Sequence, residues 1–213
     1  MTSTPRFALP GSWGRINLAT DRTTQSSIRK VVEHAIGRDD NLATLRADLR
    51  KQFASAAEIA RANSAVDFHI ALELAPGVPL PAWLGVFLPD IDSTDFAALG
   101  LTELQTALGT GLAFTDGEEA VGTKALSVGK IKAVRQAFHR IRPATDDEPA
   151  LELLQVDYWL AAAAPNRLAL LTFTTNYVDF EDQMLELFDA VISTVRWPAP
   201  ALSTAPVAET VAG

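Results

Sequence analysis

Three polar residues within one short segment are of types that could bind a divalent metal. Asp67 and His69 are two residues apart, and Glu73 follows four residues later. On an extended strand all three project from the same face. Carboxylate oxygens and imidazole nitrogens are common ligands of divalent cations. The alternative is the solvated face of an antiparallel strand whose other face is buried. We favour this alternative and predict neither a metal nor another cofactor.

A run of basic residues in the second half of the chain contains no acid. It could contact an acidic segment of a protein partner, or it could be a hydrated strand face whose long side chains lie over apolar neighbours. We favour the hydrated face, but the run is the best charged candidate for a partner contact. We take Arg135, His139, Arg140 and Arg142 as its candidate contacts. The whole run consists of Lys124, Lys130, Lys132, Arg135, His139, Arg140 and Arg142.

Four tryptophans could line a ligand groove, because each combines a large apolar surface with one hydrogen-bond donor. Packing in the core or at a sheet edge is the simpler reading for Trp13 and Trp159. Trp83 directly follows the proline-rich link at 76–81. We therefore expect Trp83 to be exposed and to anchor a partner.

The motifs of common enzyme classes are missing. Residues 109–111 (GTG) lack the lysine of a phosphate-binding loop and the third glycine of a dinucleotide fingerprint, so they are read as a helix stop. No serine lies in a Gly-x-Ser-x-Gly elbow, and His34, His69 and His139 have no motif around them. The chain has no cysteine, which excludes thiolate catalysis and disulfides. These observations favour binding over catalysis.

An enzyme or small-ligand protein remains the alternative. Its pocket would lie between sheet and helices, with polar groups such as His139, Asp157 and Tyr158 converging there. Only the tertiary structure can test that convergence.

Composition restricts the partner and the compartment. The net charge of −8 opposes binding to the phosphates of DNA or RNA, so no nucleic-acid partner is expected. No window approaches about 20 consecutive apolar residues, and residues 1–10 lack a basic region followed by an apolar run. We expect no membrane span and a cytoplasmic location. The sequence does not indicate the oligomeric state.

The hydrophobic pattern predicts the elements of the N-terminal third. Residues 7–13 and 15–18 resemble a hairpin around a Pro-Gly turn. Thr20 or Asp21 can cap a first helix that Gly37 ends. A second helix is expected from about 39 to 63. Its apolar residues recur every three or four positions, namely Leu42, Leu45, Leu49, Phe53, Ala56 and Ile59.

Alternation of apolar and polar residues then predicts a strand from Ala65 to Leu74 with Val66, Phe68 and Ile70 on its buried face. The proline-rich stretch 76–81 cannot continue a paired strand, so it should be a stiff turn leading into a strand at 83–88 that pairs with the first.

The rest of the chain continues with helix and strand signals. A helix is expected at 93–108 and a short strand at 113–115. Residues 130–142 suit either a helix or a strand, and we favour the strand. With apolar runs at 151–160 and 168–174 it forms a three-stranded meander, joined through an acidic turn at 143–149. A last helix begins at Asp179, with an apolar stripe formed by Phe180, Met184, Leu187, Phe188, Val191 and Ile192.

These elements indicate an α+β fold, an antiparallel β-sheet flanked by helices in an α/β/α sandwich. Residues 1–197 are expected to form one domain, a size that one hydrophobic core can organise. The Pro- and Ala-rich segment 198–213 lacks hydrophobic periodicity and is expected to be a disordered tail.

The order of motifs resembles the Mog/PsbP-like α/β/α sandwich superfamily. The resemblance depends on the opening FALPGSW at 7–13, the strand LLTFTT at 170–175 and the closing FDAVISTVRW at 188–197. It extends over about residues 6–197. The helices at 22–62 and the proline-rich link are less typical of that superfamily. Relatives in the superfamily mostly bind other proteins, and no catalytic residue is carried over. The resemblance implies a non-catalytic protein-binding module, an adaptor or chaperone linked to a secretion or assembly system. The partner would be bound by the sheet surface or by the helices at 22–62.

Overall fold

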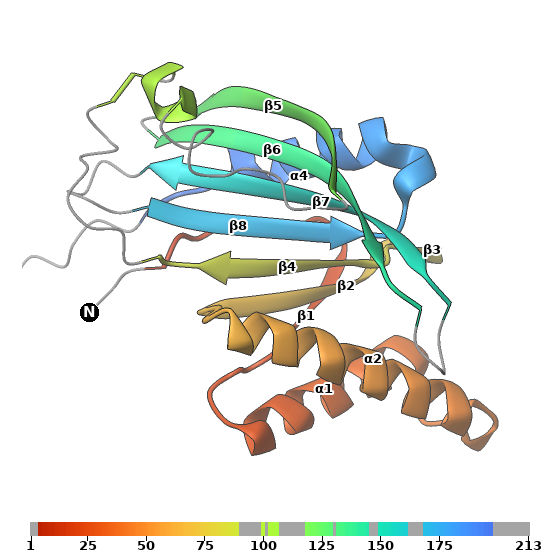
Figure 1. The fold of residues 1–213 in the computed structure, drawn as a ribbon. Coiled ribbons are helices and arrows are strands. Elements are labelled where there is room, and N and C mark those ends of the chain that lie inside the picture. Colours follow the sequence, from red (N-terminus) through yellow and green to blue (C-terminus); the bar gives the residue numbers. More distant parts are fainter. Residues whose placement is uncertain are drawn as a thin grey trace, which may run out of the picture.

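An antiparallel β-sheet runs through the computed structural model (Figure 1), which describes residues 4–89, 99–100, 102–106, 118–129, 131–144, 149–161 and 168–197. The sheet has eight strands in the order β1-β2-β4-β8-β7-β6-β5, with β3 paired to β2. Helices lie on both of its faces, so the fold is α+β, as the sequence predicts. The strands are β1 Ser12–Arg15, β2 Asp67–Ala75, β3 Val78–Pro79, β4 Ala82–Phe87, β5 Glu118–Val128, β6 Ile131–Arg142, β7 Leu151–Ala161 and β8 Leu168–Thr175.

Helix α4, Glu181–Ser193, covers one face of the sheet (Figure 1). Its buried residues Phe188, Val191 and Ile192 pack on alternate residues of β4, β7 and β8 in the main hydrophobic cluster. Phe188 is fully buried and stacks on Phe173 with 4.4 Å between ring centroids. The predicted apolar stripe of the last helix is therefore the contact that joins this helix to the sheet.

Helices α1, Asp21–Ile36, and α2, Ala43–Ala62, lie against the opposite face over the β1 and β2 side (Figure 1). A short 3-10 helix, Asp40–Leu42, joins them. Ile28, Val32 and Phe68 belong to the second cluster, which these helices form with the sheet. A third, small cluster forms where Leu104, in the helical residues 102–106, packs on β6, β7 and β8.

Several sequence predictions are confirmed. Residues 130–142 contain a strand, not a helix, and β6, β7 and β8 form the expected meander. Strand β2 pairs with β4 across the proline-rich link. Trp159 is buried and Trp13 packs against the main cluster, as predicted.

The prediction of an N-terminal hairpin is wrong. Within this part of the chain only Ser12–Arg15 forms a strand, and it pairs with β2. Gly11 turns the chain with a positive φ of 76°, and the segment before it runs beside the end of α4 instead of folding back on β1. There Arg6 and Arg196 exchange two backbone hydrogen bonds of 2.9 and 2.8 Å.

The proline-rich link was predicted to be an unpaired turn, but part of it pairs with the sheet. Val78 and Pro79 form the two-residue strand β3 beside β2. A proline is tolerated there because β3 lies off the main path of the sheet, where no further strand needs its missing N–H. Strand β5 was not predicted, since its eleven residues lack a regular alternation of apolar and polar side chains.

Five residues that the sequence predicted to be buried are exposed. Val66 precedes β2 and is 47% exposed, and Phe180 lies in a 3-10 turn, Val178–Phe180, where it contacts Tyr177 instead of the core. Leu42, at the end of the 3-10 helix, is exposed. On α2, Leu45 and Ile59 are exposed because the buried contacts of this helix are made by small residues, Ala57 and Ala60.

Some predictions lie outside the described residues. They are most of the helix at 93–108, the helix stop at 109–111, the strand at 113–115, the core of the turn at 143–149 and the tail at 198–213.

Candidate functional site

The basic residues of β6 do not form a free cationic surface. Arg135 is on the α4 side of the sheet, and its Nη1 donates to Oδ2 of Asp189 on α4 at 2.9 Å. Lys124 Nζ donates to the same oxygen at 3.2 Å, and the Tyr158 hydroxyl donates to Asp189 Oδ1 at 2.7 Å. The carboxylate of Asp189 thus accepts hydrogen bonds from two cationic side chains and from a buried phenol.

His139 is held in the same way. Its Nδ1 lies 3.1 Å from Glu152 Oε1 and its Nε2 lies 2.8 Å from Glu181 Oε2. Arg140 points to the other face by strand alternation, where its Nη1 donates to Gln155 Oε1 at 2.7 Å. Arg142 has the same parity as Arg140.

The four predicted contacts are therefore split between two faces, and at least Arg135 and His139 already face internal acids. A partner contact at any of the four stays a prediction.

The alternative pocket does not assemble. Tyr158 and Asp157 are neighbours on β7, so they project to opposite faces. Tyr158 is fully buried under α4. Burial raises the pKa of its phenol, and the hydrogen bond to Asp189 raises it further. His139 shares the α4 face with Tyr158, but its nitrogens face Glu152 and Glu181. The three groups named as a candidate pocket do not converge.

The face that carries Asp67 and His69 is not solvated, contrary to expectation. Both side chains are only 14% exposed. The N-terminal segment covers them, and the Phe7 ring stands edge-on to His69 with 5.7 Å between centroids. His69 Nε2 and Asp67 Oδ2 lie 3.2 Å apart. Among the described residues, no group of three or more His, Asp or Glu side chains has an arrangement that could hold a metal ion.

Trp83 is also not the exposed anchor that its position after the proline link suggests. It lies on β4, an interior strand of the sheet, is half-buried, and packs against the cluster beneath α1 and α2. Its contact with a partner stays a prediction.

Another group of cations lies on the two helices α1 and α2, and the local sequence explains how these helices form. Thr20 caps α1 in a reciprocal arrangement with Thr23, in which each side-chain oxygen accepts from the other residue's backbone N–H. Gly37 ends α1 with a φ of 73°, which a glycine adopts without strain. Arg61 near the end of α2 pairs with Asp21 at the start of α1. The helices are therefore joined at both ends.

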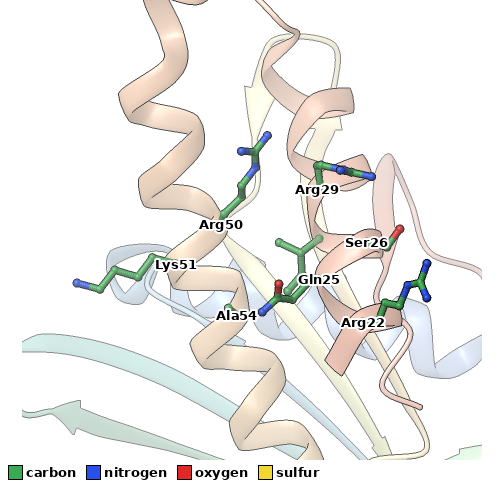
Figure 2. A pocket seen from close by; sticks show the side chains of 8 residues that line it. Arg22, Gln25, Ser26, Arg29, Arg50, Lys51 and Ala54 are labelled. Carbon is green, nitrogen blue, oxygen red and sulfur yellow. The ribbon is translucent and has the colours of Figure 1, made fainter. Parts of the chain in front are cut away.

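A groove of about 610 Å³ runs between these helices. Its lining residues are Arg22, Gln25, Ser26, Ile28 and Arg29 of α1 and Arg50, Lys51 and Ala54 of α2, with no acid among them. Figure 2 shows Gln25 and Arg50 between the helices. Arg22 and Arg29 extend from the side of α1 away from α2, and Lys51 extends from the opposite side of α2. The cations line the rims of an open groove and do not converge on one point.

The charges of the groove are only partly compensated. Within the described ranges, Arg22 and Arg29 have no ion pair. Arg50 Nη2 is 3.8 Å from Glu33 Oε1, and its buried Nε has no hydrogen-bond partner. Residues 21–62 hold eight of the 18 lysines and arginines but only six of the 26 acids. The helical hairpin is thus locally basic in a strongly acidic chain.

Sequence reasoning named the helices at 22–62 but not this set of residues. A signal was present, since positions 22, 25, 26 and 29 have the i, i+3, i+4, i+7 spacing of one helix face and are all polar. The contribution of Arg50 from α2 depends on how the two helices pack and has no local signature.

Comparison with known proteins identifies no family and only solved structures of low similarity. No family model matches the chain, and a search of the curated proteins found no match. Among solved structures, the chain is similar to LpqN of Mycobacterium tuberculosis, which is described as involved in cell envelope biogenesis. The two sequences are 10% identical, and the TM-score is 0.45 over 93% of this chain and 85% of LpqN. It is also similar to PA94 of Pseudomonas aeruginosa, a protein of unknown function, with 13% identity and a TM-score of 0.36 over 64% of this chain and 76% of PA94. At such values neither protein informs on the activity of this chain.

No helix in the described part of the chain is long and apolar enough to cross a membrane.

Proposed function

We propose that this protein is a non-catalytic binding module that holds an acidic segment of a protein partner along the groove between α1 and α2. The observation that carries the proposal is a pair of groove-lining cations, Arg22 and Arg29, that have no ion pair within the described residues. A role as an adaptor or chaperone in a secretion or assembly system, a cytoplasmic location and membership of the Mog/PsbP-like superfamily belong to the same proposal.

The shape of the groove favours an extended partner over a small anion. A site for a single phosphate needs several donors that point at one position, whereas Arg22 and Arg29 point outward from α1 and Lys51 points outward from α2 (Figure 2). Charges spread along a groove complement an acidic chain, which they attract from a distance and orient. Ile28 and Ala54 supply an apolar surface between the charges. The strong negative charge of the rest of the molecule would repel an acidic partner from other surfaces.

The alternative of catalysis has less support. Polar residues that could act as acid and base are separated by the sheet or held by ion pairs, as for Asp157, Tyr158 and His139. The groove itself is lined by permanent cations and contains no carboxylate or histidine.

The test uses a fluorescent peptide of about ten residues in which Glu alternates with Ser. When extended it spans about 33 Å, enough to follow α1, whose 16 residues cover about 24 Å. The variant Arg22→Gln/Arg29→Gln should weaken the Kd about tenfold, since each rim charge contributes about 0.5 to 1 kcal/mol. The matched control is Lys30→Gln, an exposed lysine on the same helix that does not line the groove. It should change the Kd less than twofold.

The same peptide with Gln in place of Glu should bind far more weakly, and added salt should weaken the acidic peptide. Equal effects of the double variant and Lys30→Gln would place the contact elsewhere. Tighter binding to duplex DNA or to vesicles of anionic lipid than to the peptide would replace the proposal with a different class of partner.

A further inference from the structure

A second cavity lies on the opposite side of the sheet edge, under the N-terminal segment. It has a volume of about 640 Å³, in the range of cavities that hold small metabolites. Residues 4–7 form one wall, and Arg15 of β1 with Asp67 and His69 of β2 form the other. The backbone pairing of Arg6 with Arg196 fixes the first wall in place. The cavity is therefore bounded by a strand pair and a tethered segment.

The single carboxylate in this cavity is already neutralised. Asp67 Oδ1 accepts from Arg15 Nε at 2.7 Å and from the backbone N–H of Phe68 at 3.1 Å, while Oδ2 lies 3.2 Å from His69 Nε2. Burial by itself would raise the pKa of Asp67, but His69 and Arg15 outweigh burial and lower it. Asp67 is thus a fixed anion that orients Arg15 and His69.

Cationic donors remain after this pairing. Arg15 uses only its Nε toward Asp67, and its side chain is 70% exposed, so the two terminal nitrogens face solvent. Arg6 lines the same cavity and has no ion pair within the described residues. Pro5 and the Phe7 ring add an apolar wall. His69 Nε2 is buried 3.2 Å from Asp67 Oδ2, so the imidazole belongs to the wall of the cavity beside that carboxylate.

We propose that this cavity binds a small organic anion through one carboxylate, which the terminal nitrogens of Arg15 and the guanidinium of Arg6 contact, while its apolar part packs on Phe7 and Pro5. A planar guanidinium matches a carboxylate with two parallel hydrogen bonds. The carboxylate could belong to a free organic acid or to the C-terminus of a peptide. This site shares no residue with the groove between α1 and α2, so it does not depend on the function proposed for that groove.

The experiment is an NMR titration of the ¹⁵N-labelled protein with 3-phenylpropionate and with the tripeptide Gly-Gly-Phe, each beside its neutral amide. The two acids carry the required carboxylate and aromatic group, and each amide lacks only the charge. Saturable shifts at the amides of Arg15, Phe68 and His69 with the acids, and no shifts with the amides, would support the proposal. Tighter binding of 3-phenylpropionate indicates a free acid, and tighter binding of the tripeptide indicates a peptide C-terminus.

Arg15→Gln and Arg6→Gln should each weaken the Kd for the preferred acid about tenfold, whereas Arg29→Gln in the other groove should change it less than twofold. Arg6 is exposed and its fold contact is through the backbone, so Arg6→Gln tests the site even if Arg15→Gln disturbs β1. The proposal would be overturned if the acid and its amide shifted the same NMR signals to the same extent. It would also be overturned if the folded Arg6→Gln variant bound the acid with an unchanged Kd.

Discussion

The ion cluster under α4 makes a sharp prediction about stability. Asp189 on α4 accepts hydrogen bonds from Tyr158, Arg135 and Lys124, which come from β7, β6 and β5. Its side chain is 22% exposed, that of Arg135 is 14% exposed, and Tyr158 is fully buried. Asp189→Ala leaves a buried phenol without its acceptor and a largely buried guanidinium without its carboxylate partner. Arg135 Nε already lacks a hydrogen-bond partner among the described residues.

The expected loss follows from these three contacts. An unsatisfied buried hydroxyl costs about 1 to 3 kcal/mol, and removing one partner of a buried ion pair costs about 3 to 5 kcal/mol. The ion pair here is partly exposed, and Lys124, 54% exposed, adds little. The costs are not additive within one network. We expect Asp189→Ala to lower the free energy of unfolding by about 3 kcal/mol.

Urea denaturation followed by circular dichroism measures this loss. The control is Glu186→Ala, an exposed acid on the same helix, which should change stability by less than about 0.5 kcal/mol. Because removing both partners of a buried hydrogen bond costs less than removing one, Tyr158→Phe should recover about 1 kcal/mol in the Asp189→Ala background. A loss for Asp189→Ala no larger than that of the control would refute the reasoning, and so would a further loss on adding Tyr158→Phe.

Two other predictions concern the core and the N-terminal edge. Phe188→Ala should lower the free energy of unfolding, measured in urea, by about 3 to 5 kcal/mol, because the ring is fully buried against Phe173. Leu49→Ala should lower it by only about 1 to 2 kcal/mol, because Leu49 is half-buried. Similar losses for the two variants would contradict this difference in burial. Asp67 has a pKa in the folded state below the ordinary value of 3.8, so its stabilising contribution is present above pH 3.8 and disappears as pH falls through the lower folded-state value. Asp67→Asn should therefore lower the melting temperature at pH 6, and the difference in melting temperature from the wild type should disappear as the pH falls below 3.8. A difference that stays constant with pH would show that the charge of Asp67 does not stabilise the fold.

Local patterns in the sequence were sufficient for most elements. The helical spacing of Met184, Phe188, Val191 and Ile192 predicts both α4 and its buried face, because the 3.6-residue period determines which side chains share a side of the helix. Alternation in β2 and in the apolar runs of β7 and β8 predicts strands for the equivalent reason. The α+β class follows from the order of these elements.

The same patterns failed where a side chain is covered by a segment distant in the sequence. Asp67 and His69 were predicted to be solvated because they alternate with the apolar residues Phe68 and Ile70, which take the buried face of the strand. Phe7, more than 50 residues earlier, makes that contact. The basic run at β6 was read as a free surface for a similar reason, since Asp189 and Glu181 belong to the final helix.

By itself the sequence determined the residue types, the elements and which side chains share a face, since these depend on periodicities that extend over only a few residues. It also determined that the chain is acidic overall and that residues 21–62 are comparatively basic. Only the tertiary structure decided which charges remain uncompensated. Lys124 of β5 and Arg135 of β6 face α4 and pair with Asp189, while Arg22 and Arg29 have no ion pair in the described part of the chain. Ion pairing is decided by distances of a few ångströms between segments that are remote along the chain, and no local pattern contains that information.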